Sequence, residues 1–161
     1  MNDNEDVPIR DAATVILLRK KKDSTYVLMG QRGNKAVFMP SKYVFPGGAV
    51  DEDDSNVKLF KSIKKKGINL LHKFSKKKIA KELCVAAIRE LWEEAGLRLC
   101  TKVEDVGTIS PGWEDFCNST YLPDASNLEY VFRAITPPGR PRRFDARFFI
   151  CRAENVHGNL D

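Results

Sequence analysis

Three acidic side chains in the second half of the sequence share one face of a predicted helix. Glu90, Glu93 and Glu94 stand at positions i, i+3 and i+4, and an α-helix places residues with this spacing side by side. Like charges so placed destabilise a bare helix because they repel each other. Mg²⁺ or Mn²⁺ would remove the repulsion, since both ions prefer carboxylate oxygens. The pattern favours a metal site, although such triplets also occur on solvated helix faces.

The helix that carries these acids is predicted over residues 79–95, because its apolar residues recur at helical spacing and form one stripe. The stripe consists of Ala80, Leu83, Cys84, Ala87, Ile88 and Leu91. Gly96 follows the last acid closely and suits the left-handed residue that ends many helices. Upstream, the paired glycines Gly47 and Gly48 let the backbone come close to a ligand or a metal.

The region from Phe45 to Leu97 resembles the signature of the Nudix hydrolases. Residues 89–97 read R-E-L-W-E-E-A-G-L and match the second half of that signature at every fixed position. The first half matches at Gly48 and at Asp54, where the family usually has glutamate. The departure is the gap: 34 residues lie between Asp54 and Arg89, where the family has a short spacer. An insertion therefore splits the motif.

The resemblance implies the α/β class, as a Nudix-type α/β/α sandwich with a central mixed sheet. A chain of 161 residues is expected to form one domain, so we interpret residues 1–161 as a single Nudix domain with an insertion at 56–81. Short apolar or β-branched runs predict strands. These runs are Ala13–Leu18, Tyr26–Met29, Tyr43–Phe45, Val103–Ile109, Tyr130–Ile135 and Arg147–Cys151.

The same resemblance implies a cofactor, Mg²⁺ or Mn²⁺, and the residues that hold it. The expected ligands are the carboxylates of Glu90, Glu93 and Glu94 and the carbonyl group of Gly48. Glu90 or Glu93 is expected to accept the proton of the attacking water, and Arg89 to orient a motif carboxylate by a salt bridge.

Other acids are secondary candidates at the same site. Asp51 and Asp54 could assist the metal, and we assign the better match, Asp54, to substrate binding. In some Nudix enzymes the base comes from a loop outside the motif. Glu114 and Asp115, which follow Pro111-Gly112-Trp113, are the candidates for that part here.

The insertion is strongly basic, with ten lysines and no acid between Asn56 and Lys81. We expect Ser55 to cap a short helix carrying Leu59, Phe60 and Ile63, Gly67 to end it, and residues 69–77 to add another turn or two. One interpretation is a solvated amphipathic hairpin packed on the domain. The other is an anion-attracting surface beside the active site, in which Lys64 and Lys65 bind substrate phosphate. Nucleic acid or an acidic membrane surface would be attracted by the same charge.

A second segment, Thr136–Phe149, resembles one Nudix branch, which includes the peroxisomal coenzyme A diphosphatase of animals and related bacterial proteins. The resemblance implies that Arg142 and Arg143 bind substrate phosphate, for which guanidinium groups are suited. The structural alternative is that both arginines pair with surface acids. Members of the branch usually continue with a further strand and a closing helix. This sequence ends at Asp161, so the resemblance predicts that it is shortened at its carboxyl end.

Together these features predict a Mg²⁺-dependent hydrolase of a nucleoside diphosphate linked to another moiety, with coenzyme A or an acyl-coenzyme A as the favoured substrate. Two alternatives stay open. One is a pyrophosphatase acting on ADP-ribose, NADH or an RNA cap; Pro111, fifteen residues beyond Gly96, weakly resembles the ADP-ribose branch. The other is a non-catalytic Nudix-like module that binds RNA or another anion.

Composition limits the remaining possibilities. No apolar run approaches the ~18 residues that predict a membrane span, and the acidic amino terminus is not a secretory signal. The four cysteines form no C-x-x-C pair, which argues against a zinc site and fits a reducing, cytoplasmic location. The expected partner is a small-molecule nucleotide, with nucleic acid less favoured. We leave the oligomeric state open, a homodimer being one alternative.

Overall fold

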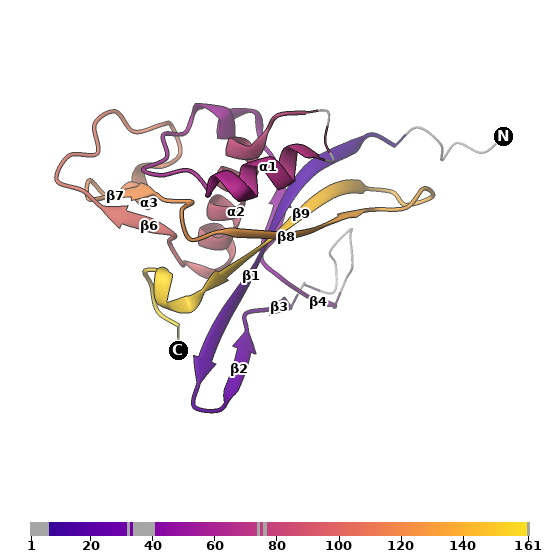
Figure 1. Ribbon diagram of the computed structural model, residues 1–161, viewed down its shortest axis with the longest axis horizontal. Coiled ribbons are helices and arrows are strands. Elements are labelled where there is room, and N and C mark those ends of the chain that lie inside the picture. Colours follow the sequence, from indigo (N-terminus) through magenta and orange to yellow (C-terminus); the bar gives the residue numbers. More distant parts are fainter. Residues whose placement is uncertain (1–6, 32, 34–40, 74, 76, 161) are drawn as a thin grey trace.

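A long central strand organises the molecule, for which a computed structural model describes residues 7–31, 33, 41–73, 75 and 77–160 (Figure 1). This strand, β1, runs from Ile9 to Lys21. Its alternate side chains Ala13, Val15 and Leu17 are buried, as expected where the side chains of a strand point in turn to opposite faces of the sheet.

The sheet around β1 is mixed. Strand β9 (Arg143–Arg152) runs parallel to β1 along its length, and β8 (Glu129–Ile135) pairs antiparallel with β9. The other edge of β1 is shared by two antiparallel strands, β2 (Ser24–Val27) and β5 (Gly47–Ala49). The predicted mixed α/β class with a central mixed sheet is confirmed. The predicted strands in residues 13–18, 130–135 and 147–151 fall within β1, β8 and β9.

The remaining elements are short. Two small antiparallel pairs are formed by β3 (Gly30–Gln31) with β4 (Tyr43–Val44), and by β6 (Cys100–Lys102) with β7 (Tyr121–Pro123). The other helical elements are η1 (Glu52–Asn56), α1 (Lys65–Lys73), α3 (Glu114–Cys117) and η2 (Ala153–Asn155).

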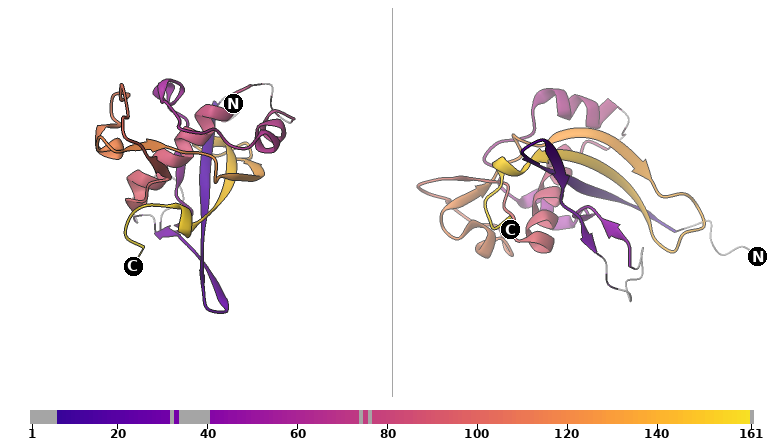
Figure 2. Two further views of the ribbon diagram at one scale, coloured as in Figure 1. Left: turned by 60° about the vertical axis from the view of Figure 1, so that its left-hand side comes forward. Right: turned by 90° about the horizontal axis from the view of Figure 1, so that it is seen from below.

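Helix α2 (Ala80–Ala95) confirms the predicted helix over residues 79–95. It packs against β1 and β5 (Figure 2), and its predicted apolar stripe is buried in the main hydrophobic core. The helix ends at Gly96, whose φ of 65° is left-handed, and the Gly96 amide donates a hydrogen bond to the carbonyl of Trp92 at 2.7 Å. A glycine fits this position because side chains disfavour positive φ.

The strand predicted over Val103–Ile109 is wrong, because the neighbouring β6 ends at Lys102. A local turn competes with the extended conformation here. The side chain of Asp105 accepts a hydrogen bond from the amide of Gly107 at 2.7 Å, and Gly107 has a φ of 65°. Aspartate and glycine at this spacing are typical turn residues.

The insertion also differs from its prediction. No helix covers residues 59–63; the short helix is η1, which precedes them. Gly67 lies inside α1 instead of ending a helix. The physical reason is packing, because a Cβ atom at Gly67 would lie 2.8 Å from Cδ1 of the buried Ile63. Glycine lets Ile63 pack close to the α1 backbone.

The insertion is packed onto the domain and keeps its lysines outward. The Phe60 amide donates to the carbonyl of Pro123 at 2.7 Å, and the Lys61 carbonyl accepts from the amide of Ala125 at 2.9 Å. Val57, Ile63 and Leu71 are buried in the core. The described lysines of the insertion are exposed: Lys58, Lys61, Lys64, Lys65, Lys66, Lys73, Lys77, Lys78 and Lys81. Lys76 lies outside the described residues.

The four cysteines, Cys84, Cys100, Cys117 and Cys151, are all buried free thiols. Burial raises the pKa of Cys84 to about 12, so this thiol is an unreactive part of the core. In the part of the chain that the structure describes, no helix combines the length and the apolar character needed to cross a membrane.

Candidate active site

Strand β5, which contains Gly47 and Gly48, lies against the last turns of α2. The Gly47 amide donates a hydrogen bond to Oε2 of Glu94 at 3.1 Å. Gly48 lies so close to Glu90 that a Cβ atom at this position would overlap the carboxylate. Pairing of Gly48 with Ala13 of β1 holds strand β5 in place. The structure therefore brings the two halves of the split motif together.

Arg89 connects these parts through its guanidinium group. Nη2 donates to the carbonyl of Ala49 at 2.9 Å, and Nη1 donates to Oε1 of Glu90 at 2.9 Å and to Oε2 of Glu93 at 3.4 Å. Nε and Nη2 bind the two oxygens of Asp54 at 3.0 and 3.2 Å. Arg89 thus contacts two motif carboxylates and strand β5 at once. Its role in orienting a motif carboxylate stays a prediction.

Asp54 lies beneath Arg89 and is almost completely buried, with 2% of its side chain exposed. Its Oδ2 atom also accepts a hydrogen bond from the Asp51 amide at 2.9 Å. Both oxygens therefore bind groups of the protein. Asp54 thus fixes the position of Arg89. The sequence analysis assigned Asp54 to substrate binding and did not predict this contact.

The acids differ in their surroundings. Burial raises the pKa of Glu90, and the negative charges of Glu93 and Glu94 add to this rise, while the neighbouring Arg89 opposes it. The Glu93 side chain is about half exposed (48%), whereas that of Glu90 is 14% exposed. A buried carboxylate between two other carboxylates is one whose charge a cation would stabilise.

The donor set suits Mg²⁺ or Mn²⁺. Hard cations take carboxylate and carbonyl oxygens, and here Glu90, Glu93, Glu94 and the backbone of Gly48 would hold the ion. As the side chains stand, however, no three acidic, histidine or cysteine groups converge as metal ligands within residues 7–31, 33, 41–73, 75 and 77–160. In this arrangement Glu90 and Glu93 accept hydrogen bonds from Arg89, and Glu94 accepts one from the Gly47 amide.

Other predicted site residues belong to other elements of the fold. Arg143 pairs with Ile9 of β1, about 13 Å along the strand from Ala13, and its Nε donates to the carbonyl of Thr136 at 3.2 Å. Arg142 is exposed beside it. Lys64 and Lys65 are at the start of α1, which contacts β8 and α2. Glu114 and Asp115 form the first turn of α3, beyond β6.

A charged cluster that the sequence analysis missed lies on β1, β8 and β9. Arg147 is 2% exposed and binds Oδ1 of Asp11 at 2.6 Å and Oδ2 of Asp145 at 3.1 Å. Arg133 binds the same Asp145 carboxylate at 2.6 Å. The available signal was the alternation of Asp145 and Arg147 within an otherwise apolar strand, because residues two apart point to one face.

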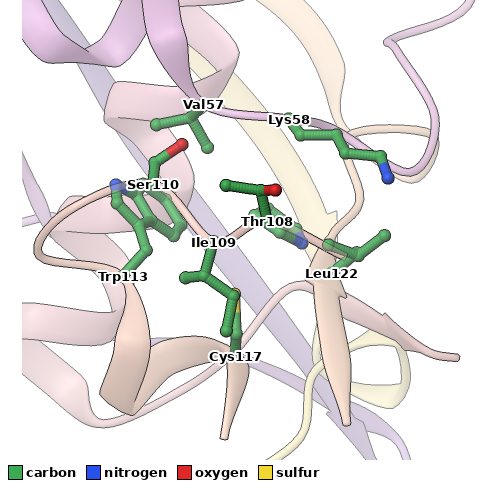
Figure 3. A pocket seen from close by; sticks show the side chains of 9 residues that line it. Val57, Lys58, Thr108, Ile109, Ser110, Trp113, Cys117 and Leu122 are labelled. Carbon is green, nitrogen blue, oxygen red and sulfur yellow. The ribbon is translucent and has the colours of Figure 1, made fainter. Parts of the chain in front are cut away.

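Two cavities lie apart from these acids. The first, of about 10 Å³, is formed between the segment after η1, the loop before α3 and strand β7 (Figure 3), and it has room for about one water molecule. Ser110 and Trp113 lie on one side of it and Leu122 on another. The second, of about 290 Å³, lies between the β1–β2 hairpin and Leu160. Neither of these two cavities is lined by Glu90, Glu93 or Glu94.

Comparison with known proteins identifies a relative and a shared fold. No family model matches the chain. A Caenorhabditis elegans protein that bears the provisional name nudix hydrolase 7 is 31% identical over 166 aligned positions, which cover 91% of this chain and 45% of the relative. The chain thus spans about half the length of that relative.

A solved structure, the NUDIX hydrolase from Alicyclobacillus acidocaldarius, superposes with a TM-score of 0.66 at 24% identity, covering 94% of this chain and 75% of the other. The mixed sheet, with the acid-bearing helix packed against a glycine loop, defines an α/β protein of the Nudix fold. The split motif and the nematode relative both show similarity to the Nudix hydrolases, and the superposition shows that the chain shares the fold of one of them.

Proposed function

We propose that the chain is a metal-dependent hydrolase that cleaves a nucleoside diphosphate linked to another moiety. The observation that carries the proposal is the approach of Gly47 and Gly48 to Glu94 and Glu90. Residues more than forty positions apart build one oxygen-rich surface, and Arg89 holds two of its acids in place.

In this proposal, Glu90, Glu93 and Glu94 hold Mg²⁺ or Mn²⁺ together with the Gly48 carbonyl. When bound, such an ion polarises a phosphoryl oxygen and lowers the pKa of a water. Glu90 or Glu93 accepts the proton of the attacking water at a carboxylate oxygen. Arg89 keeps both carboxylates oriented, and its partner Asp54 fixes the guanidinium group. Lys64, Lys65, Arg142 and Arg143 are kept as substrate-binding candidates on the surrounding surface.

The substrate class that we favour is coenzyme A or an acyl-coenzyme A. The resemblance of Phe45–Asp54 and Thr136–Phe149 to the coenzyme A diphosphatase branch supports it, as does the cationic insertion, since coenzyme A carries a 3′-phosphate besides its diphosphate. The four buried thiols support a reducing compartment such as the cytoplasm.

The deciding experiment is a substrate panel of coenzyme A, acetyl-coenzyme A, ADP-ribose, NADH and capped RNA, each with and without Mg²⁺. Products are resolved by chromatography, so that the position of the cut is seen. Coenzyme A should give 3′,5′-ADP and 4′-phosphopantetheine. If kcat/KM is higher for ADP-ribose, NADH or capped RNA than for coenzyme A and acetyl-coenzyme A, the compound with the highest value becomes the assigned substrate. Absence of turnover with every substrate, despite measurable RNA binding, would favour a binding module.

We expect dephospho-coenzyme A to be a poorer substrate than coenzyme A. A cationic side chain that binds the 3′-phosphate is left without its partner when that phosphate is absent, and enzymes reject such analogues strongly. The kcat/KM should fall by about tenfold or more, a difference of ~1.4 kcal/mol. Equal kcat/KM for the two compounds would show that the 3′-phosphate is not recognised.

The exposed lysines of the insertion should increase the rate of substrate capture. Surface cations attract anionic ligands at a distance, and salt screens this effect, with a Debye length of ~8 Å at physiological ionic strength. Replacing Lys64, Lys65 and Lys66 by glutamine should lower kcat/KM at low salt, by about tenfold at most, and flatten its salt dependence, while kcat changes little. The matched control replaces Lys20, Lys21 and Lys22 by glutamine. If kcat/KM depends on salt in the same way in the two triple variants, the insertion does not attract substrate, and the interpretation as a hairpin packed on the domain is favoured.

A further inference from the structure

Asp11 joins two segments that lie far apart in the sequence. Its backbone carbonyl accepts a hydrogen bond from the amide of Val50 at 2.9 Å, directly after the glycine loop of β5. Its carboxylate accepts hydrogen bonds from Nζ of Lys77 at 2.7 Å and from Nη1 of Arg147 at 2.6 Å. Asp11 of β1 therefore contacts Val50, which follows β5, on one side and Lys77, at the end of the insertion, on the other.

The strand side of this contact is rigid. Arg147 is buried, and besides Asp11 it binds Asp145, which Arg133 also binds through two hydrogen bonds of 2.6 Å. Nη2 of Arg147 reaches Oγ of Ser75 in the insertion at 3.4 Å. Bidentate guanidinium–carboxylate pairs fix orientation as well as distance. The segment Asp145–Arg147, which lies within Thr136–Phe149, thus supports Asp11.

The electrostatic state of Asp11 agrees with this geometry. Burial acts to raise the pKa of its carboxyl group, but the hydrogen bonds and charges of Lys77 and Arg147 hold it below its usual value. The carboxylate therefore stays ionised at neutral pH. Lys77 remains 65% exposed in this pair, whereas Asp11 is 14% exposed. Lys77 can therefore separate from Asp11 without becoming a buried, unpaired charge, and Asp11 keeps Arg147 as its partner.

We propose that Asp11 is a positioning residue that fixes the lysine-rich insertion relative to the carboxylates of α2, through Lys77 on one side and Val50 on the other. The Lys77–Asp11 contact docks the end of the insertion onto β1, next to the loop that carries Gly47 and Gly48. The contact adds to the burial of Leu71 of α1 in keeping the cations of that helix at a set place. The consequence for substrate binding rests on the proposed function, whereas the docking itself does not.

The test is amide hydrogen exchange of the full chain, followed over Lys65–Lys73, in the variants Lys77→Gln, Lys77→Arg and Lys78→Gln. Lys77→Gln removes the charge that Asp11 binds and should speed exchange in α1 by about three- to tenfold. Lys77→Arg keeps the charge, so the amide hydrogens of α1 should exchange at the same rate as in the unmodified chain. Lys78→Gln is the matched control, because it removes one exposed lysine at the neighbouring position and should also leave exchange unchanged.

Unchanged exchange in Lys77→Gln, or an equal acceleration in Lys78→Gln, would overturn the proposal. A second variant, Asp11→Asn, keeps the shape of the side chain and should accelerate exchange in the same segment. In the activity assay with coenzyme A, Lys77→Gln should raise KM at least about threefold while kcat stays within about twofold; an equal fall in kcat with unchanged KM would contradict the positioning part. If no substrate is turned over, the proposed function fails while the exchange result still decides the docking.

Discussion

Replacing Glu93 by glutamine should lower turnover by at least about a hundredfold, the scale expected when a group that stabilises developing charge is lost. The side chain is about half exposed and accepts a long hydrogen bond of 3.4 Å from Arg89. The substitution should therefore leave the fold intact. It removes one negative charge from the surface that would hold Mg²⁺. The effect should appear in kcat at saturating substrate, measured at several Mg²⁺ concentrations.

The matched control for that experiment is Glu82→Gln, which removes a glutamate from the first turn of the same helix. It should retain kcat within about twofold, because Glu82 lies about 16 Å from Glu93 along α2. Hydrolysis by the unmodified chain should also stop in excess EDTA. Full turnover in EDTA, or in Glu93→Gln, would exclude the metal-dependent mechanism proposed above.

Replacing Arg89 by methionine should destabilise the folded chain by about 3–5 kcal/mol, the usual cost of removing one partner of a buried ion pair. The reason is Asp54, which is 2% exposed and would keep a buried charge without its guanidinium partner. For a chain of this size, the loss corresponds to a fall in Tm of very roughly 10 °C. Thermal unfolding without added metal or substrate measures it independently of any activity.

Arg10→Met provides the control, since Arg10 forms a 3.7 Å pair with Asp51 in which both side chains are more than half exposed. Exposed pairs contribute little, so Tm should change by no more than about 2 °C. The Tm of Arg89→Lys should lie between those of Arg89→Met and Arg10→Met. An ammonium group keeps the charge but cannot bind both Asp54 oxygens in the forked geometry. Equal Tm values for Arg89→Met and Arg10→Met would show that the Arg89 contacts do not stabilise the fold.

The sequence predicts those parts of the fold that one local pattern determines. Helix α2 is found because its apolar stripe and Gly96 agree, and β1, β8 and β9 are found because each is an apolar or β-branched run. The segment 103–109 is wrong because an apolar content suited to a strand does not exclude a turn, and Asp105 with Gly107 forms one. Gly67 lies inside α1 because Ile63 packs against it. The spacing of apolar residues in the sequence does not reveal that contact.

The site is predictable to a similar extent. The spacing of Glu90, Glu93 and Glu94 predicts a shared face, and the glycine pair predicts a close backbone approach; the structure places Gly47 and Gly48 beside two of these acids. The burial of Asp54 beneath Arg89 and the cluster around Asp11 depend on contacts between distant residues. These contacts join residues that lie far apart in the sequence, so local patterns do not identify the partner of each residue. The metal and the substrate stay predictions.

The contact between Asp54 and Arg89 also explains how the motif tolerates its insertion. The two residues meet through side chains, so the geometry of the site is indifferent to how much chain lies between them. Closing a longer loop costs entropy that grows only with the logarithm of its length, and a fourfold longer loop costs about 1.2 kcal/mol more. Burial of Val57, Ile63 and Leu71 readily offsets this cost. The spacer is thus the position at which a chain with this split motif can acquire a new surface without a change in the contact between Asp54 and Arg89.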